Sequence, residues 1–172
     1  MKESGRNIKR RLYPLSLIGE RVARVKHFRG HGVHSPFVYN LVRKVFMRRT
    51  LIDESNTALA EALASEHLSE RRVTELQNVM SYCEVASFSV NDLQATAEFN
   101  VLTTECEPTA FAEAAEAAKR NRTTLVILLP YASAIRQEAC QEIVDSHDST
   151  SVDNRAYLIL FNNHLPKQHF KL

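Results

Sequence analysis

The sequence has little glycine, few cysteines and no long apolar run. Its glycines are Gly5, Gly19, Gly30 and Gly32, so residues 33–172 contain none. A backbone that passes close to a bound phosphate needs a position without Cβ, because a Cβ would collide with the ligand. The scarcity therefore excludes a glycine-rich cofactor loop from the chain after residue 32.

The cysteines and the short apolar stretches exclude further classes. Cys83, Cys106 and Cys140 are odd in number, far apart and without a CxxC pair, which argues against a disulfide framework and a zinc cage and predicts buried, reduced thiols. No apolar stretch approaches the roughly 20 residues that cross a bilayer. Leu12 to Gly19 contains Pro14 and leads to no small-residue cleavage site. We therefore expect a cytoplasmic chain without a membrane span.

What the sequence does have is a strong charge asymmetry behind its net charge of +2. Residues 1–50 hold 13 of the 22 Lys and Arg and only two acids, whereas residues 51–172 hold nine basic residues and 18 acids. A basic arm of this kind can bind nucleic acid, anionic lipid or an acidic partner, and it can also pack on its own acidic half. Charge alone does not distinguish these targets.

Periodicity predicts a basic helical N-terminal region over residues 1–80. Leu15 to Phe28 has apolar residues at helical spacing, and a second apolar stripe runs from Phe37 to Phe46. Asp53 or Ser55 is expected to cap an alanine-rich helix. Ser69 is expected to start another helix, which continues to Met80.

Residues 81–172 alternate between strand and helix patterns. The strand candidates are "YCEVASFSV", "EFNVLTT", "TTLVILL" and "AYLILF". Helices are predicted over Pro108 to Arg120 and over Ser133 to Ser146, the second with Ile135, Ala139, Ile143 and Val144 on one face. "TLVILL" is apolar on both faces, as in a central parallel strand covered by helices on each side, and the C-terminal end suggests a closing antiparallel pair. The prediction is an α/β domain of one core.

The stretch "HFRGHGVHSPFVYNLV", residues 27–42, has three interpretations. A metal site is disfavoured, because glycines interrupt the helix that would align His27 with His31 and no fourth ligand lies near. A weak anion or partner site is possible at a helix N-terminus. The residues that would form this site are Arg29, His31, Gly32, His34 and Ser35. The simplest interpretation is that Ser35 caps a helix that begins at Pro36.

"HGVHSPFVYNLV" and the terminal "PKQHFKL" resemble the two ends of a bacterial family of class I S-adenosylmethionine-dependent methyltransferases of the O-methyltransferase type. "EFNVLTTECEPTAFAEAAEAA" and "TTLVILLPYASAIRQEACQEIV" resemble its fourth and fifth strands, each with the following helix. The resemblance implies a truncated Rossmann-like methyltransferase sheet with the helical N-terminal region packed on it.

The chemistry of that family is missing from the matching positions. If "YCEVASFSV" is the first strand, "SFSVNDLQ" stands where the glycine-rich cofactor turn belongs. Only about nine residues separate that strand from the one that resembles the fourth, so the segment with the ribose-binding acid has no room. The acids that hold a metal at the ends of the fourth and fifth strands are replaced by Thr103 or Thr104 and by Leu129 with Pro130.

The expectation is a shortened, degenerate domain without cofactor or catalysis, whose role is interaction with a protein partner or a full-length relative, and which can be oligomeric. One alternative is a methyltransferase that binds its cofactor in an atypical way or completes its site in an oligomer. The other is an RNA-binding module that uses residues 1–50, where Tyr13, Phe28 and Phe37 lie among the basic residues.

Overall fold

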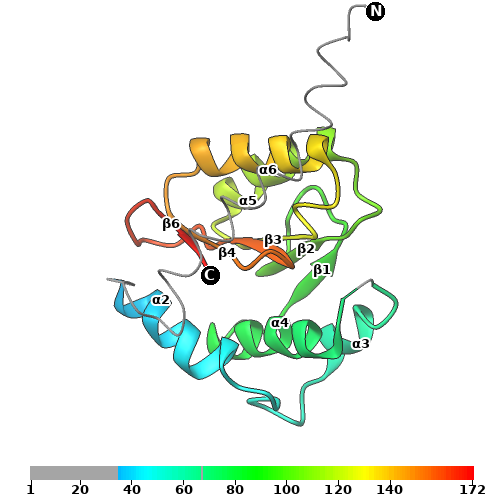
Figure 1. Cartoon of the computed structure of the whole chain (residues 1–172), viewed down its shortest axis with the longest axis vertical. Coiled ribbons are helices and arrows are strands. Elements are labelled where there is room, and N and C mark those ends of the chain that lie inside the picture. Colours follow the sequence, from blue (N-terminus) through cyan, green and yellow to red (C-terminus); the bar gives the residue numbers. More distant parts are fainter. Residues whose placement is uncertain (1–34, 67) are drawn as a thin grey trace, which may run out of the picture.

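The computed structural model describes residues 35–66 and 68–172. They form a sheet of six strands with helices on both faces (Figure 1). In chain order the elements are α2 (Pro36–Leu41), the π-helix η2 (Val42–Phe46), α3 (Ala58–Ala62), α4 (Glu70–Tyr82), β1 (Phe88–Val90), β2 (Phe99–Leu102), the 3-10 helix η3 (Pro108–Ala110), α5 (Phe111–Asn121), β3 (Thr124–Leu128), α6 (Ala134–Ser146), β4 (Thr150–Asp153), β5 (Tyr157–Leu160) and β6 (Gln168–Lys171).

The strand order in the sheet is β1-β2-β3-β5-β4-β6. β1, β2 and β3 are parallel to one another, so their carboxyl ends meet at one edge of the sheet. β5 runs antiparallel to β3 and β4, because the short connection from β4 to β5 can join only antiparallel neighbours. In that connection the Asn154 side chain accepts hydrogen bonds from the amides of Ala156 and Tyr157. The predicted closing antiparallel pair is confirmed.

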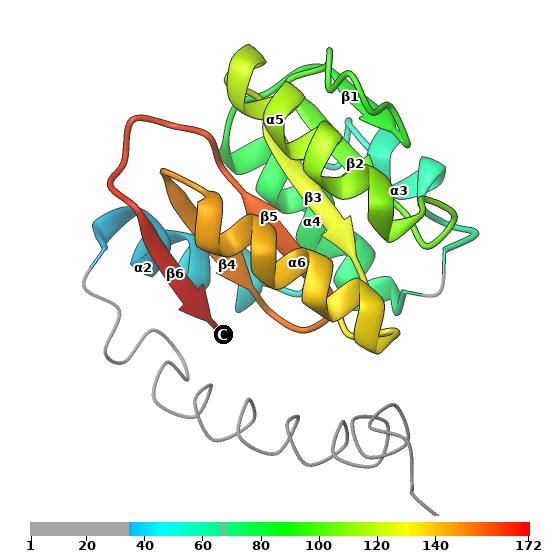
Figure 2. The same cartoon turned by 90° about the horizontal axis from the view of Figure 1, so that it is seen from above.

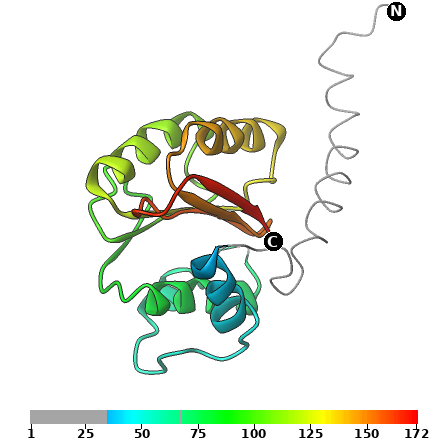
Figure 3. The same cartoon turned by 90° about the vertical axis from the view of Figure 1, so that its left-hand side faces the viewer.

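The sheet lies between two helical layers, each with its own core (Figures 2 and 3). Helices α5 and α6 cover one face, and α2, α3 and α4 cover the other (Figure 3). Along β3, Leu125 and Ile127 contact the α5 and α6 side, whereas Val126 and Leu128 contact the opposite core. All four side chains are buried, as predicted for a central strand that is covered on both faces.

Helix α4 is the centre of the helical layer opposite α5 and α6. Asn78 accepts a hydrogen bond from the Ile52 amide at 2.7 Å and donates to the Thr50 carbonyl at 3.0 Å. Gln77 accepts from the Ala60 amide at 3.1 Å. Asn78 therefore supplies partners that the irregular segment between η2 and α3 does not find within itself, and Gln77 supplies one for the first turn of α3.

Two expected boundaries are wrong. "YCEVASFSV" is not one strand, because α4 continues to Tyr82 and β1 covers only Phe88–Val90. Neither Asp53 nor Ser55 caps the alanine-rich helix, which begins after Thr57. Instead, the Asp53 carboxylate accepts from the amide and hydroxyl of Ser55 and closes a local turn. In the described ranges, no helix is both long enough and apolar enough to cross a bilayer.

Candidate functional site

Of the five residues predicted as a weak anion or partner site, only Ser35 lies in the described part of the chain. Arg29, His31, Gly32 and His34 lie outside the described residues. The Ser35 hydroxyl accepts from the Val38 amide at 3.4 Å, so Ser35 is the N-cap of α2, with proline next to it in the first turn. The helix-capping interpretation is confirmed, and anion binding at this position stays a prediction.

The carboxyl edge of β1, β2 and β3 is where an open α/β sheet binds ligands. Here the ends of β1 and β2 are joined by Asn91, whose backbone has a φ of 57°. Its side chain donates to the Thr103 hydroxyl at 3.0 Å and accepts from the Thr103 amide at 2.8 Å. The Thr103 hydroxyl also accepts from the Glu105 amide at 3.2 Å. The polar groups of both strand ends therefore bind each other.

The ends of β2 and β3 are joined by Arg136 of α6. Its guanidinium donates to the Leu128 carbonyl at 2.9 and 3.1 Å, to the Thr103 carbonyl at 2.8 Å and to the Cys106 carbonyl at 3.0 Å. It also lies 4.6 Å from the centroid of the Phe111 ring. The residue is only 4% exposed, and burial lowers the pKa of Arg136, but an arginine side chain stays charged.

This edge therefore carries a fixed cation at the carboxyl ends of β2 and β3. Leu129 and Pro130, which follow β3, offer no ligand oxygen in their side chains. Glu105 and Glu107 are both exposed. Among residues 35–66 and 68–172, no three His, Cys, Asp or Glu side chains are grouped to hold a metal ion.

A small cavity lies beside this edge, between α6 and the sheet. Its volume is about 20 Å³, and its lining includes Tyr131, Cys140, Asp153 and His169. Tyr131 donates to the Asp153 carboxylate, and the Ser151 hydroxyl lies 2.9 Å from His169 Nδ1. A volume of this size holds about one water molecule. Burial raises the pKa of Cys140 to about 12, so its thiol stays protonated and is not a nucleophile at neutral pH.

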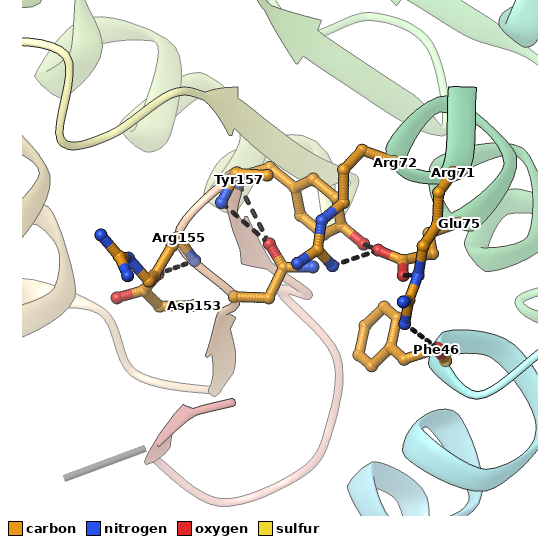
Figure 4. Close-up of polar contacts among 9 residues, drawn as sticks. Phe46, Arg71, Arg72, Glu75, Asp153, Arg155 and Tyr157 are labelled. Carbon is orange, nitrogen blue, oxygen red and sulfur yellow. Dashed lines mark hydrogen bonds and ion pairs between the residues drawn. The ribbon is translucent and has the colours of Figure 1, made fainter. Parts of the chain in front are cut away.

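A buried polar network joins α4 to the sheet on the opposite face (Figure 4). Glu75 is 0% exposed, and its carboxylate accepts from Arg71 Nε at 3.0 Å, from Arg72 and from the Tyr157 hydroxyl at 3.0 Å. Arg71 also donates to the Phe46 carbonyl at 3.3 Å. Burial and the Glu75 charge raise the pKa of Tyr157 well above its ordinary value, so its hydroxyl stays a donor. The network connects η2, α4 and β5.

A shallow basic hollow lies at the end of η2, beside the end of α4. Three exposed basic residues, Arg43, Lys44 and Arg48, line it together with Ser81, Tyr82 and one exposed acid, Glu84. It holds three of the four basic residues in the described part of the basic arm that the charge asymmetry predicted. Phosphate groups are the ligands that such a surface fits.

Sequence reasoning missed both Arg136 and Glu75. The expected buried face of α6 started at Ile135, but Ile135 is 70% exposed. The face that is buried consists of Arg136, Cys140, Ile143 and Val144. These residues lie three or four positions apart along the helix and therefore share one face, which is the sequence signal that could have identified Arg136 as buried.

Comparison of the chain with protein-family models, curated proteins and solved structures finds no match. Function is therefore inferred from the geometry of the sheet edge and from the sequence resemblance.

Proposed function

We propose that the chain is a truncated, Rossmann-like methyltransferase domain that neither binds S-adenosylmethionine nor catalyses methyl transfer, and that it acts through interaction with a protein partner. The observation that carries this proposal is the Arg136 guanidinium, bound by three carbonyls across the ends of β2 and β3. The guanidinium occupies the edge where a catalytic metal ion and its acidic ligands would be needed. Its buried positive charge repels a metal cation at that place.

The order of the parallel strands supports the truncation. In the doubly wound order 3-2-1-4-5-6, strands 1, 4 and 5 are neighbours. β1, β2 and β3 are neighbours in the same way, with β2 and β3 each followed by a helix on the same face of the sheet. Only residues 91–98 join β1 to β2, a connection too short for two further strands with their helices.

The test is calorimetric titration of the full chain with S-adenosylmethionine. We expect no binding heat, because the strand ends bind each other and no glycine turn follows β1. A one-to-one complex tighter than about 100 μM, or about −5.5 kcal/mol, would contradict the proposal. Repeating the titration at high protein concentration covers the alternative in which an oligomer completes the site.

A second candidate, RNA binding, is favoured by the basic hollow of Arg43, Lys44 and Arg48. Tyr82 lines the same hollow, and a cationic surface with an aromatic side chain suits single-stranded RNA. The salt-dependent titration described in the Discussion tests RNA binding by the whole basic arm, to which the hollow contributes Lys44, separately from cofactor binding.

A further inference from the structure

The outer surface of the α5 and α6 layer has an apolar groove that nothing in the described chain covers. The groove is about 360 Å³ in volume and runs between the two helices. Ala112 and Ala115 of α5 and Ala139 of α6 line it, with Ile135 at one end. Ile135 is 70% exposed, more than any other large apolar side chain among the described residues. Small side chains let another helix approach closely, and an exposed isoleucine gains from burial.

The rim of this groove is acidic. Glu116 of α5 and Glu138 and Glu142 of α6 line it, and no lysine or arginine is among its described lining residues. In the described part of the chain, none of these three carboxylates forms an ion pair. The groove therefore fits an occupant with an apolar face flanked by positive charges.

The chain itself contains a segment with this chemistry. Residues 15–28 have Leu15, Ile18, Val22 and Val25 at helical spacing, and Arg21, Arg24 and Lys26 lie between them. As a helix, these residues would extend about 21 Å, close to the roughly 20 Å of α6. We propose that the groove binds residues 15–28 of a second copy of the chain.

We assign the segment to a second copy because residues 15–28 of the same chain are too close to α2 in sequence to reach the groove. Helix α2 lies on the sheet face opposite α5 and α6 (Figures 1 and 3). A helix in the groove would form a fourth layer, and three layer spacings of about 10 Å place it roughly 30 Å from the layer of α2. Residues 29–34 span at most about 25 Å between Phe28 and Ser35 and would also have to pass round the sheet. This inference names the partner of the proposed interaction role and rests on that role.

Charge-reversal variants of the full chain test the proposal. Their self-association is measured by sedimentation velocity from low to high micromolar concentration. The groove variant is Glu138→Lys with Glu142→Lys, and the segment variant is Arg21→Glu with Arg24→Glu. A third protein combines all four substitutions. The matched control is Glu54→Lys with Glu61→Lys, which makes the same charge change at exposed positions before and within α3, a helix on the other side of the sheet.

We expect the unmodified chain and the control to associate and the groove and segment variants each to associate at least about tenfold more weakly. The combined protein should regain association, because the opposite charges again face each other. Ile135→Ser, at an exposed position that the fold does not need, should also weaken association. A chain that stays monomeric throughout, or a groove variant that associates like the control, would overturn the inference. Neither result would alter the calorimetry with S-adenosylmethionine, so the two proposals fail separately.

Discussion

Arg136 is a buried cation whose partners are all backbone carbonyls. Because these carbonyls lie just after β2, just before η3 and at the end of β3, the side chain holds three segments at one point. Arg136→Met would leave the carbonyls buried without donors. We expect it to lower the free energy of unfolding by about 3–5 kcal/mol, since hydrogen bonds to a charged group contribute about 1.5–3 kcal/mol each and are not additive. Urea unfolding of the full chain measures the change.

Two comparisons give this prediction its specificity. Arg136→Lys keeps the charge but has one compact ammonium group, which does not reach three carbonyls together, so it should recover less than half of the loss. Arg122→Met at an exposed position should change stability by at most about 0.5 kcal/mol. An Arg136→Met chain as stable as Arg122→Met would show that the carbonyls find other donors.

Some residue positions could not be predicted because their conformation depends on distant contacts. Leu129 has a φ of 46°, in the region that favours glycine, although nothing in its own side chain favours that conformation. Its amide donates to the Ala156 carbonyl at 2.8 Å, so the neighbouring connection holds it there. Glu75 likewise finds Tyr157 82 positions along the chain. By contrast, the burial of Cys140 and Cys106 follows from residue type alone, although Cys83, predicted to be buried as well, is only partly buried.

Among the described residues, three helices follow a serine, and their capping hydrogen bonds differ. Ser133 accepts from the Arg136 amide at 3.1 Å and Ser35 from the Val38 amide at 3.4 Å, whereas Ser69 makes no capping bond through its side chain. We expect Ser133→Ala and Ser35→Ala each to cost about 1 kcal/mol of stability and Ser69→Ala only a few tenths. Thermal melts of the three variants measure the order. Equal losses at all three serines would contradict the assignment.

The elements that could be predicted are those with a local signal of sufficient length. The pattern of β3 and the serine before α6 are such signals, and both elements formed within a residue or two of their predicted bounds. The boundary between α4 and β1 could not be placed, because Tyr82 and Cys83 suit either a strand or a helix and pack on the core from the end of α4. The pairing of β6 beside β4 is a long-range choice that no local pattern specifies.

At the scale of the whole molecule, charge is divided along the chain. The described basic residues of the arm gather at η2, and the acidic groove lies between α5 and α6 on the opposite side of the sheet. RNA bound at Arg21 and Arg24 would cover residues 15–28, the segment that we propose for the groove, so a polyanion and the acidic groove would compete for that segment. This competition makes the response to salt informative, because affinity for RNA depends on the number of phosphates that are neutralised.

Replacing Arg21, Arg24, Arg29 and Lys44 by Gln tests RNA as the target of the arm. If the chain binds RNA through these residues, fluorescence titration with labelled single-stranded RNA should show weaker binding, and the slope of log affinity against log salt should fall by about 0.7 for each phosphate that is no longer neutralised. The control replaces four exposed basic residues outside the arm by Gln, namely Lys119, Arg120, Arg122 and Lys167. Equal, weak binding by both variants and the unmodified chain at every salt concentration would exclude RNA. A loss of stability in the arm variant alone would instead indicate that these residues dock on the acidic half of the protein.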